Sequence, residues 1–432
     1  MSYSSRCRLQ PALLGVTALA LLAIALLVGP PTAGAQQLGL PLCDLPGLPI
    51  CEPEPGPGPP PLPPAPKPTE PGDCNFARTP VNGDKRAVSA SAPNPLAGEK
   101  WYVDTYRKRS GNKQYREPAY RDYLRAKGRD KALLGKVALT PRFTWFGRFT
   151  PMPARICAFV QTAEADASVP LVTVLRHQGR KCNADYQAGG VAEDDRSKAW
   201  YDRLARGIGT SRAIIAFEPD SVGTIDCLAK SRRKARLNLL RYGVDVLSKL
   251  PNVTIYIEAS ASDWRPAKEV AQRLRYIGIA KVRGFMLNVT HFDWTAANVR
   301  YGMEVSRMVG GKHFIVSTNH SGRGPVHYRK RIGDRNRRVV INCQPLRRGL
   351  GPNPTTKTAT SRVDAYMWIS RPGYSRGACN GGPPKEGDWW LDRALELARY
   401  ATPWTGPPRG TRYGFPSGKL SLGQAAGDQL QR

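Results

Sequence analysis

Short apolar runs alternate with longer helix-like segments between about residues 74 and 405, and this alternation leaves few folds open. The runs are rich in β-branched residues, as buried strands are. They are Val169–Leu175, Ala213–Phe217, Val253–Ile257, Val282–Val289, Phe314–Ser317 and Val363–Ile369. The helix-like segments include Leu228–Leu250, Pro266–Ile277 and Trp294–Val309. Strand and helix recurring roughly every 35–45 residues predict an α/β fold, a parallel sheet that closes toward a TIM-like barrel if enough units are present.

Residues 1–35 have the pattern of a signal peptide. Arg6 and Arg8 precede an apolar run, Leu13–Val28, and the small residues Ala33 to Ala35 offer a cleavage site. An uncleaved membrane anchor is the alternative, because the apolar stretch nearly reaches spanning length. Either interpretation places the rest of the chain outside the cytoplasm, and the first predicts a secreted, extracellular protein.

The remaining segments differ in composition. Residues 36–51 form a short piece that contains Cys43 and Cys51, and residues 52–73 are so rich in proline that we expect an extended linker. Residues 74–405 form the predicted domain. The tail, residues 406–432, is rich in Gly, Pro and polar residues, and we expect it to be disordered.

Cysteine usage agrees with export. Of nine cysteines, Cys7 leaves with the signal peptide, and the other eight are Cys43, Cys51, Cys74, Cys157, Cys182, Cys227, Cys343 and Cys379. An even number in an exported chain predicts four disulfides, although about 105 pairings are open. No CxxC pair is present, so we expect no zinc site, no other metal and no cofactor.

The net charge of +31 favours anionic partners at short range. The basic residues are spread over many segments and are densest at 105–136 and 323–348. This spread indicates a solvated basic surface that associates electrostatically with an anionic cell envelope, with no specific nucleic-acid partner. We also expect the protein to be a monomer. A nucleic-acid or envelope-binding role driven by charge alone is the remaining alternative.

Polar and aromatic residues follow four of the predicted strands, in the segments 218–221, 258–264, 288–294 and 317–324. Because the carboxyl ends of parallel strands meet at one edge, the carboxylates there should share one site. Glycoside hydrolysis needs a protonated carboxyl for the leaving oxygen and a base for water. Tryptophans that could stack on sugars are Trp145, Trp264, Trp294 and Trp368, whereas Trp389 and Trp390 fit core packing.

Several motifs, in their order along the chain, resemble those of glycoside hydrolase family 6, the family of certain cellulases. They are Asn94–Gly98 with Trp101–Val103, Trp145–Gly147, Gly179–Cys182, Glu218–Ser221, Gly284–Val289, Gly349–Pro352, Asp364–Trp368 and Arg371–Gly373. The resemblance covers about residues 94–402. It implies a distorted, partly open α/β barrel of about seven strands and a secreted glucanase that cuts β-1,4-glucan with inversion.

The resemblance also implies individual roles. Asp220 stands where the family keeps its general acid, and Trp145 and Trp264 stand at substrate-stacking positions. It implies two disulfides, Cys182 with Cys227 and Cys343 with Cys379. The pairing of the other four cysteines of the exported chain stays open.

Two catalytic positions of the family are altered in this chain. Lys181 stands for an aspartate that keeps the acid protonated, and Arg376 stands for the aspartate proposed as the base. Cations at these positions favour ionised Asp220, so we expect hydrolysis to be weak. Glu258 replaces a family aspartate and is a candidate accessory carboxylate, and the cluster at 193–195 is another candidate base.

Substrate-binding positions of the family also change. The residues now found at them are His291, Asn342, Ser370 and Tyr374, and Ala261 replaces a nearby histidine. Two hypotheses follow: a hydrolase with Asp220 as its acid, or a binding protein for anionic polysaccharide on the same scaffold. In the second, a basic cleft is formed by Lys181, Arg376, His291, His320 and Arg323.

Overall fold

The computed structural model describes residues 84–108, 114–148, 150–176, 190–332, 334–341, 343–407 and 429–430. The predicted signal peptide, the short cysteine-containing segment and the proline-rich linker lie outside this part of the chain, as does most of the C-terminal tail. None of the described helices is long and apolar enough to cross a membrane.

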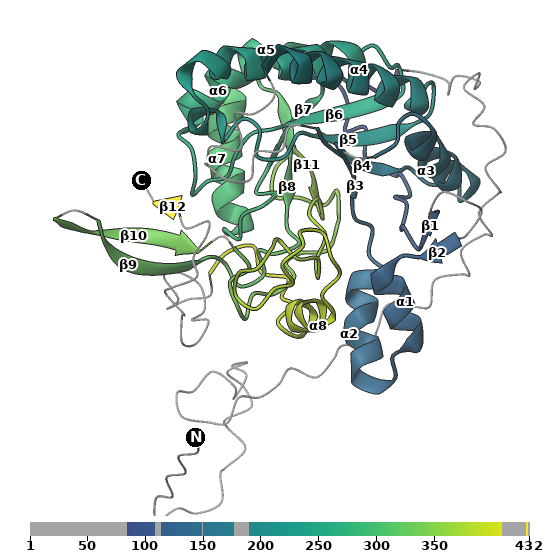
Figure 1. Cartoon of the computed structure of the whole chain (residues 1–432), viewed down its shortest axis with the longest axis vertical. Coiled ribbons are helices and arrows are strands. Elements are labelled where there is room, and N and C mark those ends of the chain that lie inside the picture. Colours follow the sequence, from purple (N-terminus) through teal and green to yellow (C-terminus); the bar gives the residue numbers. More distant parts are fainter. Residues whose placement is uncertain are drawn as a thin grey trace, which may run out of the picture. The chain divides into compact units, whose positions relative to one another are not determined.

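Seven parallel strands form one curled sheet in the order β11-β8-β7-β6-β5-β4-β3 (Figure 1). They are β3 (Thr144–Gly147), β4 (Leu171–Leu175), β5 (Ala213–Phe217), β6 (Val253–Glu258), β7 (Gly284–Leu287), β8 (His313–Ser317) and β11 (Val363–Met367). The six apolar runs correspond to β4 to β8 and β11. At the open side, the Phe143 N–H donates to the Trp368 carbonyl at 2.9 Å. The prediction of a distorted, partly open α/β barrel is confirmed.

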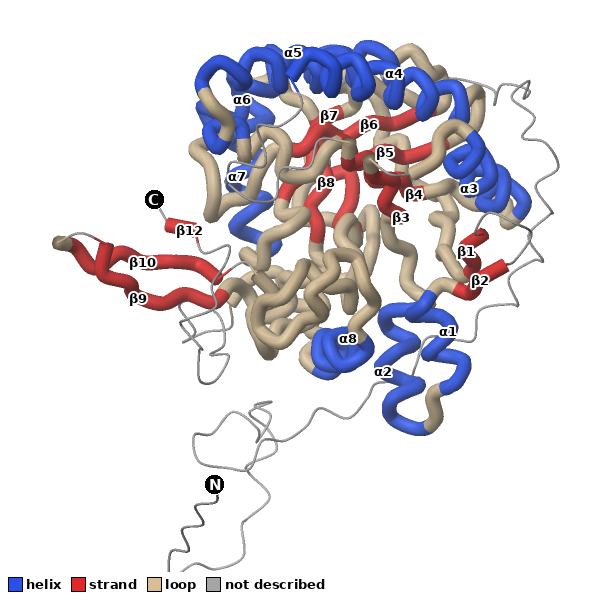
Figure 2. Tube along the Cα trace, viewed as in Figure 1, coloured by secondary structure: helices blue, strands red, loops and turns tan. Residues whose placement is uncertain are grey.

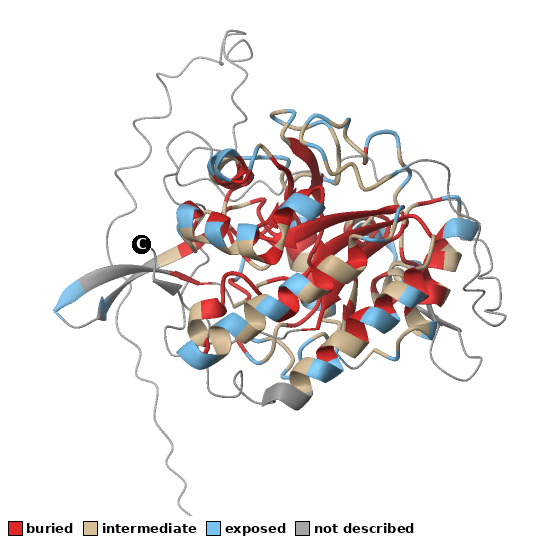
Figure 3. Cartoon of the chain, turned by 90° about the horizontal axis from the view of Figure 1, so that it is seen from above, coloured by how far each residue is buried: buried red, intermediate tan, exposed pale blue. Residues whose placement is uncertain are grey.

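Crossover helices join successive strands from β3 to β8 and cover the outer face of the sheet (Figures 1 and 2). They are α3 (Ala154–Ala165), α4 (Gly190–Ile208), α5 (Lys230–Leu247), α6 (Ala267–Ile277) and α7 (Thr295–Met308). Two apolar clusters line the sheet, an outer one shared with the helices and an inner one inside the barrel. On β5, Ile215 and Phe217 belong to the outer cluster and Ile214 to the inner one. Both faces of the strands are therefore buried (Figure 3).

One glycine shows how closely the outer helices approach the sheet. A Cβ added to Gly243 of α5 would lie 2.7 Å from the Phe217 ring and 3.0 Å from Tyr201. Real Cβ atoms do not pack at the shorter of these distances, so a side chain here would push α5 off β5.

Smaller elements surround the barrel. They are β1 (Tyr106–Lys108), β2 (Gln114–Arg116), α1 (Pro118–Arg125), α2 (Gly128–Ala138), α8 (Leu391–Arg399) and the 3₁₀ turns η4 (Ile225–Cys227) and η5 (Ile279–Lys281). Helices α1, α2 and α8 share an apolar cluster that contains Leu133, Val137 and Leu397. This cluster is separate from the two that line the sheet.

The basic segment between β8 and β11 forms an antiparallel hairpin where a crossover helix would be expected. Its strands are β9 (Val326–Ile332) and β10 (Arg335–Ile341), and they extend beside the barrel (Figure 1). Gln429–Leu430 of the predicted tail pair with β10 as β12. The sequence pattern did not predict this hairpin.

Residues 84–92 form a strap across the amino ends of the strands. Arg283, just before β7, donates to the carbonyls of Ala87, Ser89 and Ala92. Lys312, just before β8, donates to the Val88 carbonyl at 2.6 Å. Arg283 itself is fully buried and pairs with Asp364 at 2.8 Å. Buried cations thus hold the strap at the end of the sheet opposite the predicted site.

The predicted Cys343–Cys379 disulfide is present, with Cα atoms 6.1 Å apart. Cys227 is also disulfide-bonded, and its predicted partner, Cys182, lies outside the described residues. Among the cysteines whose pairing stayed open, Cys157 is buried on α3.

Candidate active site

Left-handed backbone conformations cluster where β5, β6 and β7 end. Glu218 and Asp220 have φ values of 55° and 65°, Ser260 has 70° and Asn288 has 63°. Non-glycine residues adopt such values rarely, at a cost on the order of 1–3 kcal/mol each. Strain of this kind accumulates at functional sites, so the carboxyl edge of the sheet is the candidate active site.

Asp220 is half-buried and keeps one oxygen open. Its Oδ1 accepts a 2.6 Å hydrogen bond from the Thr290 hydroxyl. No described residue donates a hydrogen bond to Oδ2. A buried oxygen without a donor would belong to the set of buried unsatisfied polar atoms, and Oδ2 is not in that set. Oδ2 is therefore accessible. In contrast, the neighbouring Glu218 is fully buried and accepts from the Arg176 N–H and the Tyr201 hydroxyl.

Glu258, at the end of β6, is close enough to Asp220 for their charges to interact, but both of its oxygens already accept hydrogen bonds. Its Oε2 accepts from the N–H groups of Val222 at 2.6 Å and Gly223 at 3.2 Å, and its Oε1 accepts from the Ser260 N–H. Burial raises the pKa of Glu258 to about 7, and the negative charge of Asp220 adds to the effect. Since both oxygens already have donors, the side chain supports the turns that carry Asp220.

Asp263 and His291 form a buried pair beside Asp220. The Nδ1 of His291 lies 2.7 Å from Asp263 Oδ1, and the imidazole stacks on Trp264 with ring centroids 4.9 Å apart. Burial alone would lower the pKa of His291, but the negative charge of Asp263 and its hydrogen bond raise it above the usual value. Asp220 also raises this pKa, and Arg376 opposes it, so all these groups lie within electrostatic range.

Arg376 lies at the same site. Its guanidinium donates to the Thr290 carbonyl and lies 5.4 Å from the centre of the Phe292 ring. Its backbone N–H donates to Gln344 Oε1, next to the Cys343–Cys379 disulfide. Thr290 thus contacts Asp220 through its hydroxyl and Arg376 through its carbonyl.

Other residues proposed from sequence have different surroundings. The Trp145 indole donates to the Ile369 carbonyl at 2.7 Å, and Ser370 donates to the Val289 carbonyl. Tyr374 instead directs its hydroxyl to Glu117, the N-cap of α1, so it is not brought to Asp220. Lys181 and Asn342 lie outside the described residues.

Two residues proposed for the basic cleft, His320 and Arg323, also differ in their surroundings. His320 is buried and stacks on Phe292 with centroids 5.0 Å apart, and burial together with the charge of Arg376 holds its pKa well below the usual value. Arg323 lies over the Tyr400 ring at 4.5 Å. Of the two, His320 is therefore near Arg376, but uncharged.

The acidic cluster on α4 is engaged in ion pairs. Glu193 contacts Arg176 at 2.5 Å and Arg196 at 2.8 Å. Asp194 contacts Arg232 at 2.7 Å, and Asp195 contacts Lys198 at 3.1 Å. These carboxylates are thus committed to cations, and nothing in their geometry favours them as a base.

The model of the family described as "Glycosyl hydrolases family 6" matches residues 82–401. The chain belongs to this family. This family 6 chain is 33% identical over 313 residues to Endoglucanase A of Cellulomonas fimi, covering 72% of this chain and 62% of that protein. It is 29% identical over 287 residues to Endoglucanase A of Thermobispora bispora, covering 65% and 59%. The chain therefore spans about three fifths of the length of these two relatives.

Solved structures agree. The family 6 chain matches the endoglucanase Cel6 from Mycobacterium tuberculosis with 34% identity and a TM-score of 0.61, covering 71% of this chain and 99% of that one. That structure is a complex with methyl-cellobiosyl-4-deoxy-4-thio-β-D-cellobioside. The endoglucanase Cel6B from Humicola insolens, at 19% identity and a TM-score of 0.57, supports the fold alone.

Three residues of this family 6 site were not singled out from sequence: Thr290, Asp263 and Asp293. All follow β6 or β7 within the polar segments that were identified, which was the available signal. Burial raises the pKa of Asp293 to about 6, with Asp263 adding to it, and its oxygens accept from the Ser262 hydroxyl and the Trp294 N–H. The contacts that these three side chains make depend on the conformation of the loops after β6 and β7, which the sequence does not give.

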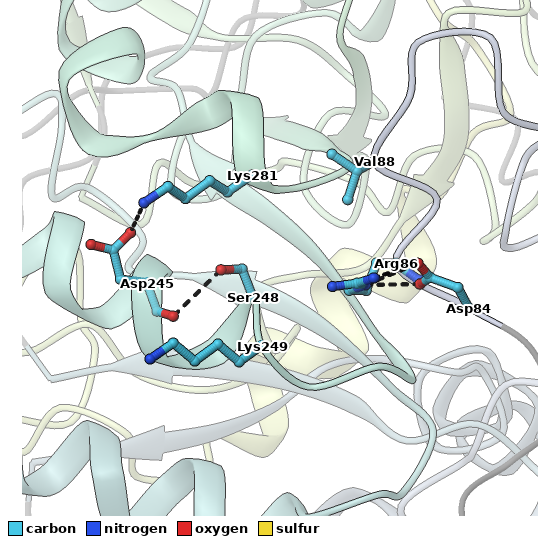
Figure 4. Close-up of a pocket in the computed structure, with 7 residues that line it drawn as sticks. All are labelled: Asp84, Arg86, Val88, Asp245, Ser248, Lys249 and Lys281. Carbon is cyan, nitrogen blue, oxygen red and sulfur yellow. Dashed lines mark hydrogen bonds and ion pairs between the residues drawn. The ribbon is translucent and has the colours of Figure 1, made fainter.

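A cavity of about 690 Å³ lies away from this site, beside the strap (Figure 4). Its lining residues are Asp84, Arg86, Val88, Asp245, Ser248, Lys249 and Lys281. Arg86 pairs with Asp84 at 2.6 Å and Lys281 with Asp245 at 2.5 Å. Because these charges are paired and Asp220 is absent from the lining, we do not assign the cavity to the candidate active site.

Proposed function

We propose that this chain is an O-glycosyl hydrolase that cuts β-1,4-glucan with inversion, with Asp220 as general acid. The observation that carries the proposal is the accessible Oδ2 of Asp220, on a strained turn at the carboxyl end of β5. The relatives named endoglucanase, and the cello-oligosaccharide analogue in the M. tuberculosis complex, support β-glucan as the substrate. We also propose that the protein acts outside the cell as a monomer.

The geometry of Asp220 suits proton donation. Thr290 occupies Oδ1 as a donor, so the proton belongs on Oδ2, which faces accessible space. As the glycosidic bond breaks, Oδ2 gives this proton to the departing oxygen. The Thr290 hydroxyl then stabilises the carboxylate that remains, since hydrogen bonds to charged acceptors are stronger than those to neutral ones.

Two tryptophans of the sheet and its carboxyl edge are proposed to hold the sugars. Trp145 is half-buried within β3, and its hydrogen bond to the Ile369 carbonyl fixes the orientation of the indole. Trp264 is half-buried, packed on Gly223 and stacked with His291. We propose that both side chains contact the glucan chain, whose sugar faces pack well on aromatic rings.

The test is release of reducing sugar from soluble β-1,4-glucans and from acidic glycans. Asp220→Asn should lower kcat by about 10²–10⁴-fold, because it removes the proton donor. Asp195→Asn is the matched control, since Asp195 is exposed and contacts only Lys198 among the described ion pairs. Its kcat should equal that of the wild type.

Other results would contradict the proposal. A wild type that releases no sugar from any glycan, yet binds acidic glycans in a salt-sensitive way, would support the anionic-polysaccharide-binding alternative. Equal rates for wild type and Asp220→Asn would remove Asp220 from the mechanism.

A further inference from the structure

Inverting hydrolysis needs a base for water as well as an acid, and the family position for that base holds Arg376. The described carboxylates near Asp220 are poorly placed to replace it. Glu258 accepts backbone N–H groups on both oxygens. Asp293 accepts from Ser262 and from the N–H of Trp294. A different type of side chain must therefore accept the proton, if the base comes from this edge of the sheet.

His291 is the side chain with an open acceptor. Its Nδ1 is occupied by Asp263 Oδ1 at 2.7 Å, which leaves Nε2. No described residue forms a hydrogen bond with Nε2. A buried atom without a partner would belong to the set of buried unsatisfied polar atoms, and Nε2 is not in that set. Although the residue as a whole is only 3% exposed, Nε2 is therefore its accessible polar atom.

The chain links these two open atoms closely. Thr290 precedes His291, and its hydroxyl holds Oδ1 of Asp220 at 2.6 Å. The stack of His291 on Trp264, with an interplanar angle of 22°, fixes the plane of the imidazole. An acid and an oriented imidazole thus lie at one site, next to a tryptophan proposed to contact the sugar.

We propose that His291 Nε2 is the general base that activates the hydrolytic water, and that Asp263 is the residue that positions it. This inference rests on the proposed inverting hydrolysis. It replaces the carboxylate base lost at Arg376 with a carboxylate–imidazole pair.

The water oxygen forms a bond to the anomeric carbon, while one water proton passes to Nε2 of His291. The bond between the anomeric carbon and the glycosidic oxygen breaks, and that oxygen takes the proton from Oδ2 of Asp220. Afterwards the imidazolium returns its proton to solvent, and Asp220 is reprotonated. Asp263 keeps the proton of neutral His291 on Nδ1 and stabilises the imidazolium.

The charges around His291 come from several elements. Asp263 follows β6, Asp220 follows β5, Asp293 follows β7 and Arg376 follows β11. The carboxylates favour the imidazolium, and Arg376 disfavours it. An imidazole made more basic by Asp263 is a better proton acceptor, provided that it is neutral when water arrives.

The main experiment compares wild type with His291→Asn, which keeps an amide that can donate to Asp263. We expect kcat on soluble β-1,4-glucan to fall by about 10²–10⁴-fold. The dissociation constant for methyl-cellobiosyl-4-deoxy-4-thio-β-D-cellobioside should stay within about twofold, because this variant loses proton transfer and not sugar contacts. In His291→Ala, added imidazole should restore about tenfold or more of the lost rate.

A second variant probes Asp263. Asp263→Asn removes the charge that raises the basicity of His291, so the limb of the pH–rate profile set by His291 should move to lower pH. A purely structural role would lower the rate without moving that limb.

Unchanged kcat in His291→Asn, or a loss confined to KM, would overturn the assignment of the base and leave the proposed hydrolysis intact. The same holds if imidazole restores nothing to a folded His291→Ala. A wild type with no turnover would overturn both.

Discussion

Thr290 donates its hydroxyl to Asp220 at 2.6 Å across the ends of β7 and β5. This hydrogen bond leaves a single oxygen of the acid free for substrate. The pair therefore sets which oxygen carries the proton, and its removal gives the first prediction.

Thr290→Val should lower kcat by about tenfold or more, since hydrogen bonds to charged groups contribute roughly 1.5–3 kcal/mol. Thr290→Ser keeps the hydroxyl and should stay near the wild-type rate. Steady-state kinetics on a soluble β-glucan measures both. If both variants lose the same activity, the methyl group matters and the hydroxyl does not.

Restoring the family carboxylates should increase hydrolysis. Lys181→Asp combined with Arg376→Asp places carboxylates again at the two altered family positions, and negative charge near a catalytic carboxyl group favours its protonated form. Initial rates on β-glucan should exceed those of the wild type. A wild type as fast as the double variant would show that the cations do not limit the acid.

Arg376→Asp can also be combined with His291→Asn. If His291 is the base, Arg376→Asp in the His291→Asn background should return activity, because a carboxylate again stands at the family position. Arg376→Asn in that background is the matched control without charge. Equal rates in the two combinations would mean that no base has been restored.

We expect Glu258 to make the free energy of unfolding depend on pH. Its folded pKa of about 7 lies above the ordinary value of 4.5, so the folded state holds the proton more tightly than the unfolded state. The contribution of Glu258 to the free energy of unfolding should therefore fall as pH rises from about 4.5 to 7, by on the order of 3 kcal/mol.

Urea unfolding of wild type and Glu258→Gln, followed between pH 4.5 and 8, isolates this effect. The stability of the wild type relative to the variant should decrease as the pH rises. A difference between the two proteins that does not change with pH would contradict the assignment.

The two disulfides can be tested directly. Non-reducing peptide mapping should find Cys182 joined to Cys227. Replacing Cys343 and Cys379 with Ser should lower the free energy of unfolding by roughly 3–4 kcal/mol, because a bond spanning 36 residues restricts the unfolded chain. Free thiols at 182 and 227 in the folded protein would contradict both the pairing and the export of the chain.

The sequence pattern predicted the barrel because its strands are buried on both faces and read as uninterrupted apolar runs. Strand β3 was missed, since Thr144–Gly147 has only four residues. The β9–β10 hairpin was missed because its many basic residues hide the alternation typical of strands. In both cases the pairing partner, and not the local sequence, decides the structure.

The site was predictable by position and not by contact. The ends of β5, β6 and β7 were identified, but the direction of each side chain depends on distant partners. Tyr374 is the clearest case, since its hydroxyl meets Glu117, 257 residues earlier in the chain. No local pattern around Tyr374 contains that information.

The strap at residues 84–92 and the candidate active site lie at opposite ends of the sheet. Bonds from Arg283 and Lys312 tie it to the amino ends of the strands, whereas Asp220 and His291 stand at the carboxyl ends. The described part of the chain therefore begins on the face away from the acid, where buried cations anchor it.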